Sequence, residues 1–317
     1  MDSGLIFINK KSGVTSFDAL RVIKRALGTG KAGHTGTLDK FASGLLIVLT
    51  GKALKLSKWF SHCDKKYQGR IHLGTETDTL DPEGKIIGEA ALPSLKKVED
   101  ALPHFTGVIT QSPPVYSAIH INGKRASDLA RSGVTPEMRK RQVTIYHLEL
   151  LSWHPPFADI FVHCSSGTYI RSLARDIALA AGSRGYLDSL LRTNVAGFSL
   201  EMAADKQGTR DYKDGFKSGE GRKDIHVLPV NKSVISSLGM PRLEVTREEA
   251  RYIFHGKPLD IILKNKLTDY SDNEFSKSFN NAEDINKPLA VFHDEELIAV
   301  LEKSHANWKY GCVISRD

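Results

Sequence analysis

Cysteine is scarce in this sequence of 317 residues, and the scarcity excludes two classes of protein. The three cysteines, Cys63, Cys164 and Cys312, lie far apart, and no two of them form a C-x-x-C pair. Disulfide-stabilised folds and structural zinc sites need several cysteines at close spacing. We therefore expect neither a disulfide framework nor a bound metal, and the reducing cytoplasm is the default compartment.

A long apolar run is also missing. No uncharged stretch reaches the roughly 18 residues that a membrane-spanning helix needs. The first residues, 1–11, lack the charged head and the apolar stretch of a signal peptide. With 40% hydrophobic and 26% charged residues, the composition is that of an ordinary globular protein, and no membrane association is expected.

Acidic residues are fewer than basic ones, and the excess of basic residues is not spread evenly along the chain. The formal net charge is +7. Residues 240–317 contain 11 Lys and Arg against 14 Asp and Glu, which leaves 33 basic and 23 acidic residues in 1–239. Such an excess suits a polyanionic partner, for example nucleic acid. If a polyanion binds, the N-terminal part does most of the binding.

The hydrophobic pattern predicts helices and strands in irregular order. Helical periodicity predicts helices at 52–60 and 169–181, and a third that Thr15 or Ser16 caps and Gly28 ends. Because the elements do not alternate regularly, we expect an α+β class with a mixed, largely antiparallel sheet and flanking helices. Apolar runs predict strands at 5–8, 45–49, 67–73, 143–150 and 158–164.

Two domains are expected. Residues 1–239 contain every motif described below, and residues 240–317 are expected to form a small β-rich C-terminal domain. Two polar segments, 206–223 and 264–287, are predicted loops. Because the C-terminal part is acidic, we expect a chain that ends near Leu238 to fold and to keep its kcat, with a higher KM.

Three short segments concentrate residues that can do chemistry. They are a glycine-rich loop, GHTGTLD at 33–39, a strand start at 65–69 and a helix start, GTYIR at 167–171. Taken alone, each segment has an ordinary structural explanation, which composition favours. These explanations are a turn aspartate at Asp39, core packing at Tyr67 and a solvated helix arginine at Arg171.

Two further motifs favour a functional explanation over these structural ones, because five motifs that follow one another in a fixed order do not arise by chance. They are QSPPVYSA at 111–118 and LLRTNVAGF at 190–198. Together the five resemble the TruB family of tRNA pseudouridine synthases. The resemblance implies the pseudouridine synthase fold with a small RNA-binding-like C-terminal domain. It also implies isomerisation of uridine 55 in the T arm of tRNA by base flipping. The implied enzyme is a monomer that needs no guide RNA, protein partner or cofactor, and the T stem-loop of tRNA is its partner.

The resemblance assigns roles to individual residues. Asp39 is the implied catalytic carboxylate, Tyr67 stacks on the target base, and Arg171 pairs with Asp39. The implied substrate-binding residues include His34, which helps to dislodge the base, and Leu191, which walls the pocket. The full substrate-binding set is Lys10, His34, Asp81, Leu191, Arg139, Lys140 and Arg141.

The segment near 115–142 resembles the RNA-clamping insertion of the family. Within it, residues 123–143 carry six basic and two acidic side chains, which favours phosphate contact. Three positions depart from the family pattern and put individual contacts in doubt. They are Lys11, where proline is usual, His120, where lysine is usual, and Ser127, where tyrosine is usual.

The implied reaction breaks the N1–C1′ bond, turns the base and joins it again through C5. A carboxylate can attack C1′, attack C6 or remove the C2′ proton, and the sequence leaves these three routes open. Burial disfavours an ionised carboxylate, which a bidentate guanidinium such as Arg171 counters. No step changes oxidation state, so neither cofactor nor metal is expected.

Two rival functions remain open at this point. A guide-RNA-dependent relative would assemble with protein partners, and a non-catalytic RNA binder or tRNA-folding chaperone would need no catalytic set. The presence of Asp39, Tyr67 and Arg171 together favours an enzyme.

Overall fold

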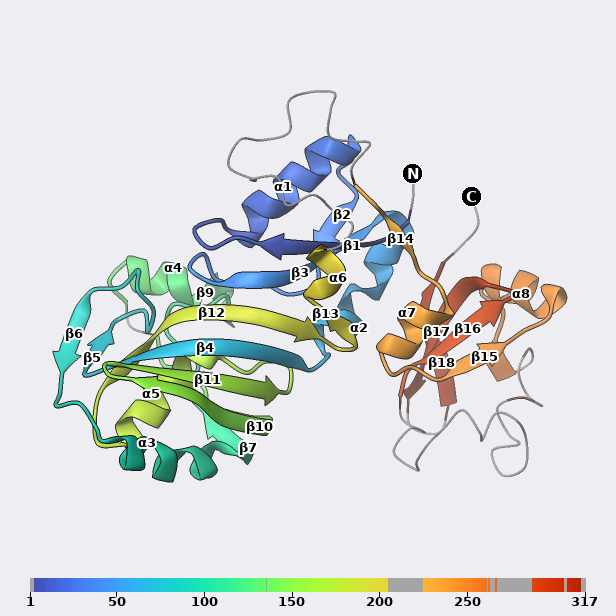
Figure 1. Cartoon of the computed structure of the whole chain (residues 1–317). Coiled ribbons are helices and arrows are strands. Elements are labelled where there is room, and N and C mark those ends of the chain that lie inside the picture. Colours follow the sequence, from blue (N-terminus) through green and yellow to red (C-terminus); the bar gives the residue numbers. More distant parts are fainter. Residues whose placement is uncertain are drawn as a thin grey trace.

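Two β-sheets form the framework of the molecule (Figure 1). The computed structural model describes residues 3–134, 136–204, 225–260, 262, 266, 287–304 and 307–314. The predicted loop 206–223 lies outside the described residues, and so does 264–287 apart from Lys266 and Lys287. Within the described part of the chain, no helix is long and apolar enough to cross a membrane.

The larger sheet has ten strands, and its spatial order brings together segments that are far apart in the sequence. Two short strands lie off the main path, since β2 (Ala32–His34) pairs with β3 and β13 (Phe198–Ser199) pairs with β12. The main path is β14 (Leu228–Pro229), β1 (Gly4–Lys10), β3 (Ser43–Thr50), β12 (Gly185–Val195), β4 (Lys65–Leu73), β11 (Phe157–Cys164), β10 (Arg141–His154) and β7 (Gly107–Gln111).

Among the described strands of this sheet, β3 and β12 form the one parallel pair, and the other pairs are antiparallel. It is short, with Ser43 opposite Leu191 and Gly44 opposite Arg192. Gly44 has a φ of +107°, and a Cβ there would lie 2.3 Å from the carbonyl oxygen of Arg192. Only glycine permits this approach, so the two halves of the sheet meet at a fixed point.

Helix α1 (Ser16–Leu27) covers one half of the larger sheet. The Thr15 hydroxyl accepts a bond from the Asp18 amide at the N-terminus, and Gly28 ends the helix with a φ of 63°. These caps confirm the predicted start and end. The buried face of α1, which includes Leu20 and Ile23, packs on apolar residues of β1 and β3.

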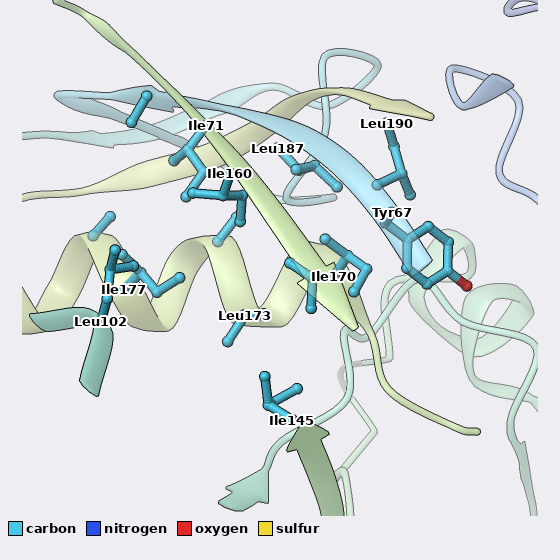
Figure 2. Close-up of a cluster of buried hydrophobic side chains, with 14 of the residues drawn as sticks. Tyr67, Ile71, Leu102, Ile145, Ile160, Ile170, Leu173, Ile177, Leu187 and Leu190 are labelled. Carbon is cyan, nitrogen blue, oxygen red and sulfur yellow. The ribbon is translucent and has the colours of Figure 1, made fainter. Parts of the chain in front are cut away.

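Helix α5 (Ile170–Ala180) covers the other half. Its apolar face packs against β4, β11 and β12 in the main hydrophobic cluster (Figure 2). Tyr67 lies at one end of this cluster, with its hydroxyl pointing away from the labelled aliphatic side chains. The tyrosine is therefore held by the core on one side and presents a polar atom on the other.

Short elements connect these layers. The predicted helix at 52–60 is present as a 3-10 turn followed by a short α-helix, and the first two residues of the predicted loop at 33–39 belong to β2. The connecting elements are η1 (Gly51–Leu56), α2 (Ser57–Ser61), β5 (Thr75–Thr77), β6 (Ile86–Glu89), α3 (Leu95–Ala101), η2 (Leu102–Phe105), β8 (His120–Ile121), β9 (Lys124–Arg125), α4 (Ala126–Arg131), α6 (Glu201–Ala204) and α7 (Lys232–Ser237).

The smaller sheet lies in the C-terminal part, beside α8 (Arg247–Phe254). Its core is partly its own and partly shared, because a second cluster joins Phe292 and Val300 to Leu5 and Phe60 of the larger part. The α+β class and the small β-rich C-terminal part are as predicted. The four strands are β15 (Arg242–Glu244), β16 (Leu289–His293), β17 (Glu296–Ser304) and β18 (Asn307–Val313), in that order.

Candidate active site

Asp39 lies in the loop between β2 and β3, which is tied to the sheet and to α1. The Ser16 hydroxyl donates to the carbonyl of Leu38 at 2.9 Å and accepts from the amide of Leu38 at the same distance. The ammonium group of Lys10 donates to the carbonyls of Ala42 at 2.6 Å and Val14 at 2.6 Å. The residue before Asp39 and the segment after it are thus both fixed.

The guanidinium of Arg171 lies between two carboxylates. Its Nε is 3.0 Å from Oδ2 of Asp39, and its Nη2 is 3.3 Å from Oδ1 of the same carboxylate. Its Nη1 is 3.1 Å from Oδ2 of Asp81 and 2.8 Å from the carbonyl of Thr79, while Nη2 also donates to the carbonyl of Tyr116. The Arg171 side chain is 5% exposed and that of Asp39 is 39% exposed. The pair is therefore anchored on the arginine side and open on the carboxylate side.

Asp81 is the buried member of this network. Its Oδ1 accepts from the Thr79 hydroxyl at 2.6 Å and from the amide of Glu83 at 3.0 Å. Burial raises the pKa of Asp81, and the bond from Thr79 and the charge of Arg171 oppose that effect. With an 8% exposed side chain, Asp81 is suited to holding Arg171 rather than to meeting a substrate directly.

The start of α5 is clamped by Gln111, a residue of the Q-x-P-P motif to which no role was assigned. Its side-chain amide donates to the carbonyl of Tyr169 at 3.1 Å and accepts from the amide of Tyr169 at 2.8 Å. Gln111 is fully buried and replaces a helix cap, since Tyr169 provides no capping side chain. Arg171 lies two residues further on. The clamp therefore fixes the start of the helix and with it the position of the Arg171 side chain.

Tyr67 and Leu190 pack together in the main cluster, and Figure 2 shows them as neighbours. The sequence led us to Leu191 as the pocket wall, and the structure corrects this expectation. Leu191 is the register partner of Gln68, so both side chains point to the opposite face of the sheet from Tyr67. The leucine beside the tyrosine is Leu190.

Burial raises the pKa of Tyr67 to about 12, and Arg192 opposes this effect through its charge and a hydrogen bond. Arg192 is the register partner of Tyr67 on β12 and is 2% exposed. Neither its burial nor its contact with the tyrosine was expected from the sequence. The motif contained Arg192, but only a strand assignment for 185–195 would have placed it on the face of Tyr67.

Lys10 lies at the base of the loop, and His34 is half-buried at the end of β2. Lys10 is fully buried, and burial lowers its pKa to about 8, with Asp39 as the main opposing influence. Burial and the charge of Arg192 both lower the pKa of His34, which favours a neutral imidazole. Lys10 is thus arranged to position the loop.

The basic segment lies near the same site. Arg139 and Lys140 are exposed, whereas Arg141 is half-buried with its guanidinium 4.5 Å from the centre of the Tyr169 ring. Arg141 is therefore partly a packing residue at the start of α5, and the two residues before it are the solvent-facing cations.

A cavity of about 640 Å³ lies on the face of β4 away from Tyr67. Gln68, Arg70 and Leu191 line it, and a bidentate pair between Arg70 and Asp159 closes one side. Its walls contain neither Asp39 nor Arg171, although Leu190 also lines it. Within the described residues, no group of three or more His, Cys, Asp or Glu side chains could hold a metal ion.

This arrangement holds one half-exposed carboxylate against a guanidinium, beside a buried tyrosine. The carboxylate is oriented by the charge and the fixed position of the guanidinium. It can then react with an electron-poor carbon or take a proton, while the apolar wall keeps water from the reacting atoms.

Comparison with known proteins places this chain in a class. A solved structure described as "Structure of H/ACA RNP bound to a substrate RNA containing 2'-deoxyuridine" has a TM-score of 0.63 at 21% sequence identity and covers 94% of this chain and 77% of that chain. A structure of a Cbf5–Nop10–Gar1 complex has a TM-score of 0.62 at 24% identity, over 94% of this chain and 78% of that chain. A family model described as "TruB family pseudouridylate synthase (N terminal domain)" matches residues 24–170. Fold and sequence together define a pseudouridine synthase.

The sequence relatives are more specific. A protein of Azoarcus sp. (strain BH72) named tRNA pseudouridine synthase B is 38% identical over 257 residues, which cover 81% of this chain and 83% of that protein. A protein of Borreliella burgdorferi (strain ZS7) with the same name is 45% identical over 204 residues, covering 63% and 72% respectively. The chain belongs to the TruB family of pseudouridylate synthases.

Proposed function

We propose that this protein isomerises uridine to pseudouridine at position 55 in the T arm of tRNA, and that it acts without a guide RNA. The relatives named tRNA pseudouridine synthase B support tRNA as the substrate. The observation that carries the proposal is the Arg171 guanidinium, held between the carboxylates of Asp39 and Asp81.

Asp39 is the proposed catalytic carboxylate. Cleavage of N1–C1′ leaves cation-like character at C1′, as in glycoside hydrolysis. Asp39 can meet this carbon because its side chain is 39% exposed, and Arg171 orients its carboxylate. Attack at C1′, attack at C6 and removal of the C2′ proton all use the same carboxylate oxygen atoms.

Tyr67 and Leu190 are the proposed walls for the detached base. The released uracil must turn by one ring position without escaping, which requires a tight and dry enclosure. The ring of Tyr67 offers a stacking surface, and its hydroxyl is the group that we assign to removal of the C5 proton. Both residues come from the main cluster, so the enclosure is rigid on that side.

Access to the uridine requires base flipping. Unstacking a nucleotide costs a few kcal/mol, which stacking and phosphate contacts offset. We assign His34, on the short strand before the catalytic loop, to the space that the base leaves. A neutral imidazole suits this role, because it can enter the gap without the larger desolvation penalty of a charged ring. Arg139 and Lys140 are the proposed phosphate contacts.

A direct assay tests the proposal. Purified protein is incubated with an unmodified tRNA transcript, and pseudouridine is mapped by chemical labelling and primer extension. We expect one modified position, in the T loop, from the protein alone. A requirement for added protein or RNA would instead favour the guide-dependent rival. An Asp39→Asn sample serves as the control for contaminating enzyme.

The proposed active form is a monomer in the cytoplasm. A guide-independent enzyme needs no partner to select its uridine, because the T loop itself supplies the recognition. Size-exclusion chromatography of the protein with and without tRNA tests the monomer, and cell fractionation tests the compartment.

A further inference from the structure

Arg192 is a buried cation that the proposed chemistry has not used. Its side chain is 2% exposed, with Nε 2.8 Å from the carbonyl of Leu45 and Nη2 3.1 Å from the carbonyl of Gly36. Among the described residues, the charged or titratable group that influences its pKa is the hydroxyl of Tyr67, not a carboxylate. Burying a charge without a counter-ion is costly. Apolar packing would be more stable at this position, so a role in function is expected.

The position of Arg192 links the two halves of the site. Its backbone is the contact point with Gly44, where β12 meets β3. Its side chain turns back to Gly36, three residues before Asp39. On its other side, the cross-strand partner is Tyr67. One guanidinium therefore bonds the loop that carries the carboxylate and faces the strand that carries the tyrosine.

We propose that Arg192 is a positioning residue that fixes the Tyr67 hydroxyl relative to the Asp39 loop for removal of the C5 proton. The proposal rests on the proposed function. It adds that the last proton transfer depends on a residue buried beneath the site, which acts through Tyr67 and does not touch the base.

The chemistry of that step explains why a cation is needed. After C5 joins C1′, the C5–H electron pair forms the C5=C6 bond, the C6=N1 pair returns to N1, and N1 takes a proton from solvent. The oxygen of Tyr67 accepts the C5 proton and releases its own hydroxyl proton to solvent. Burial raises the pKa of Tyr67, which opposes its ionisation, and Asp39 acts in the same direction. A fixed positive charge at Arg192 counters both effects.

The test compares Arg192→Lys and Arg192→Met with Arg70→Lys as a matched control. Arg70 lies on the same strand as Tyr67, but its guanidinium pairs with Asp159 on the opposite face. Turnover is measured with tRNA that carries uridine, or uridine deuterated at C5, at the target position. Affinity for tRNA and the circular dichroism spectrum are recorded for each variant.

We expect Arg192→Lys to lower kcat by about tenfold or more, and Arg192→Met by more, with KM changed by less than about threefold. The C5 deuterium isotope effect on kcat should increase in both variants, because the slowed step is the one that breaks C5–H. The control should match the wild type in both respects. A lowered kcat with an unchanged isotope effect would overturn the proposal, since Arg192 would then act on an earlier step.

A second variant keeps the test valid if Arg192 cannot be replaced without unfolding. Tyr67→Phe leaves the guanidinium in place and removes the hydroxyl. It should reduce kcat at least as much as Arg192→Lys and leave tRNA affinity nearly unchanged. Normal turnover by Tyr67→Phe would also overturn the proposal. Failure of the wild-type protein to modify tRNA would instead disprove the proposed function, so the two failures are distinguishable.

Discussion

The larger and the smaller part of the molecule differ in whether they bury charged side chains. Every buried charged side chain among the described residues belongs to the larger part of the molecule. The core of the smaller sheet consists of apolar residues such as Leu289, Val291 and Ile298. Because buried charge destabilises a fold unless it is compensated, its confinement to the larger part marks that part as the one shaped for chemistry. The buried charged residues are Lys10, Lys65, Glu76, Asp81, Arg171 and Arg192.

The smaller sheet contributes in another way. The shared cluster joins its apolar residues to those of the larger part, and two polar contacts add to it. The ammonium of Lys58 is 2.8 Å from Glu302, and that of Lys55 donates to the carbonyl of Val313 at 2.6 Å. The comparison predicts that changes in the larger sheet affect rate, and that changes in the smaller sheet affect stability.

Replacement of Asp39 by Asn should have the largest effect. The amide is nearly the same size but cannot act as a nucleophile or a base, so turnover should be lost. Affinity for tRNA should change by less than about tenfold, or about 1.4 kcal/mol. Single-turnover assays and filter binding give the two quantities. Turnover by a pure Asp39→Asn sample at the same uridine would contradict the assignment.

Replacement of Arg171 by Lys should come next. Lysine keeps the charge but cannot contact both carboxylates and two carbonyls at once. We expect kcat to fall about a hundredfold or more, roughly 2.7 kcal/mol, with little change in tRNA affinity. Arg175→Lys, one turn later and paired with Asp176, is the control and should keep a near-normal rate.

Much of the fold followed from the sequence because periodicity and caps are local signals. The strands at 5–8, 45–49, 67–73, 143–150 and 158–164 and helix α1 were predicted within a few residues. Strand β12 was not predicted, because Asp188, Ser189 and Thr193 interrupt its apolar pattern. Its two register shifts further obscure the alternation of faces.

The same strand explains the error at the pocket wall. Leu190 and Leu191 are adjacent and chemically identical, so only the strand register separates them. The sequence motifs therefore identified the loop of Asp39, Tyr67 and Arg171. They did not show on which face of the sheet the side chains of adjacent strands lie. The clamp by Gln111 and the burial of Arg192 depend on contacts between distant segments, which one sequence cannot reveal.

Removal of the C-terminal part tests the other side of the comparison. The negative charge of this part led us to expect that a chain ending near Leu238 would still fold. The shared cluster changes that expectation, because truncation would expose Leu5 and Phe60. We now expect a loss of stability of about 5 kcal/mol or more. Urea denaturation of the truncated and full chains measures it.

Catalysis should respond differently to the same truncation. Among the described residues, the hydrogen-bond and ion-pair partners of Asp39, Tyr67, Arg171 and Arg192 all lie before residue 200. Where the truncated chain stays folded, at low temperature, kcat should lie within about tenfold of the full protein. A hundredfold fall in kcat with a native-like spectrum would show that the smaller sheet takes part in assembling the site.

Lys10 should give a smaller effect that depends on pH. Its native pKa of about 8 lies below the ordinary lysine value of 10.5, so the unfolded state binds more protons between these values. Stability from this group therefore rises with pH in that window, and its burial penalty is fully present below about pH 8. Between pH 8 and 9.5, the wild type should gain about 2 kcal/mol relative to Lys10→Met. Parallel urea titrations that show no such gain would contradict the lowered pKa of the buried Lys10 ammonium.

The smallest effect should come from the exposed basic segment of the larger part. Arg139 and Lys140 are exposed, whereas Arg141 packs on Tyr169, so only the first two should act as free phosphate contacts. Each contact adds about 0.7 to 0.9 to the slope of log affinity against log salt. The double variant Arg139→Gln, Lys140→Gln should thus reduce the slope by about 1.4 to 1.8.

The matched control is Lys96→Gln, Lys97→Gln on α3, which removes the same charge from another surface. Binding of tRNA is measured between about 50 and 200 mM salt, a range over which phosphate contacts dominate the change in affinity. The Arg139 and Lys140 variant should lose affinity mainly at low salt and keep its kcat, because contacts made equally in the ground and transition states affect binding alone. If both double variants reduce the slope equally, the effect reflects net charge, and residues 139–140 are a solvated surface. If only the Arg139 and Lys140 variant reduces the slope, the charged residues of the larger part have two roles. The buried ones set the rate, and the exposed ones bind the RNA.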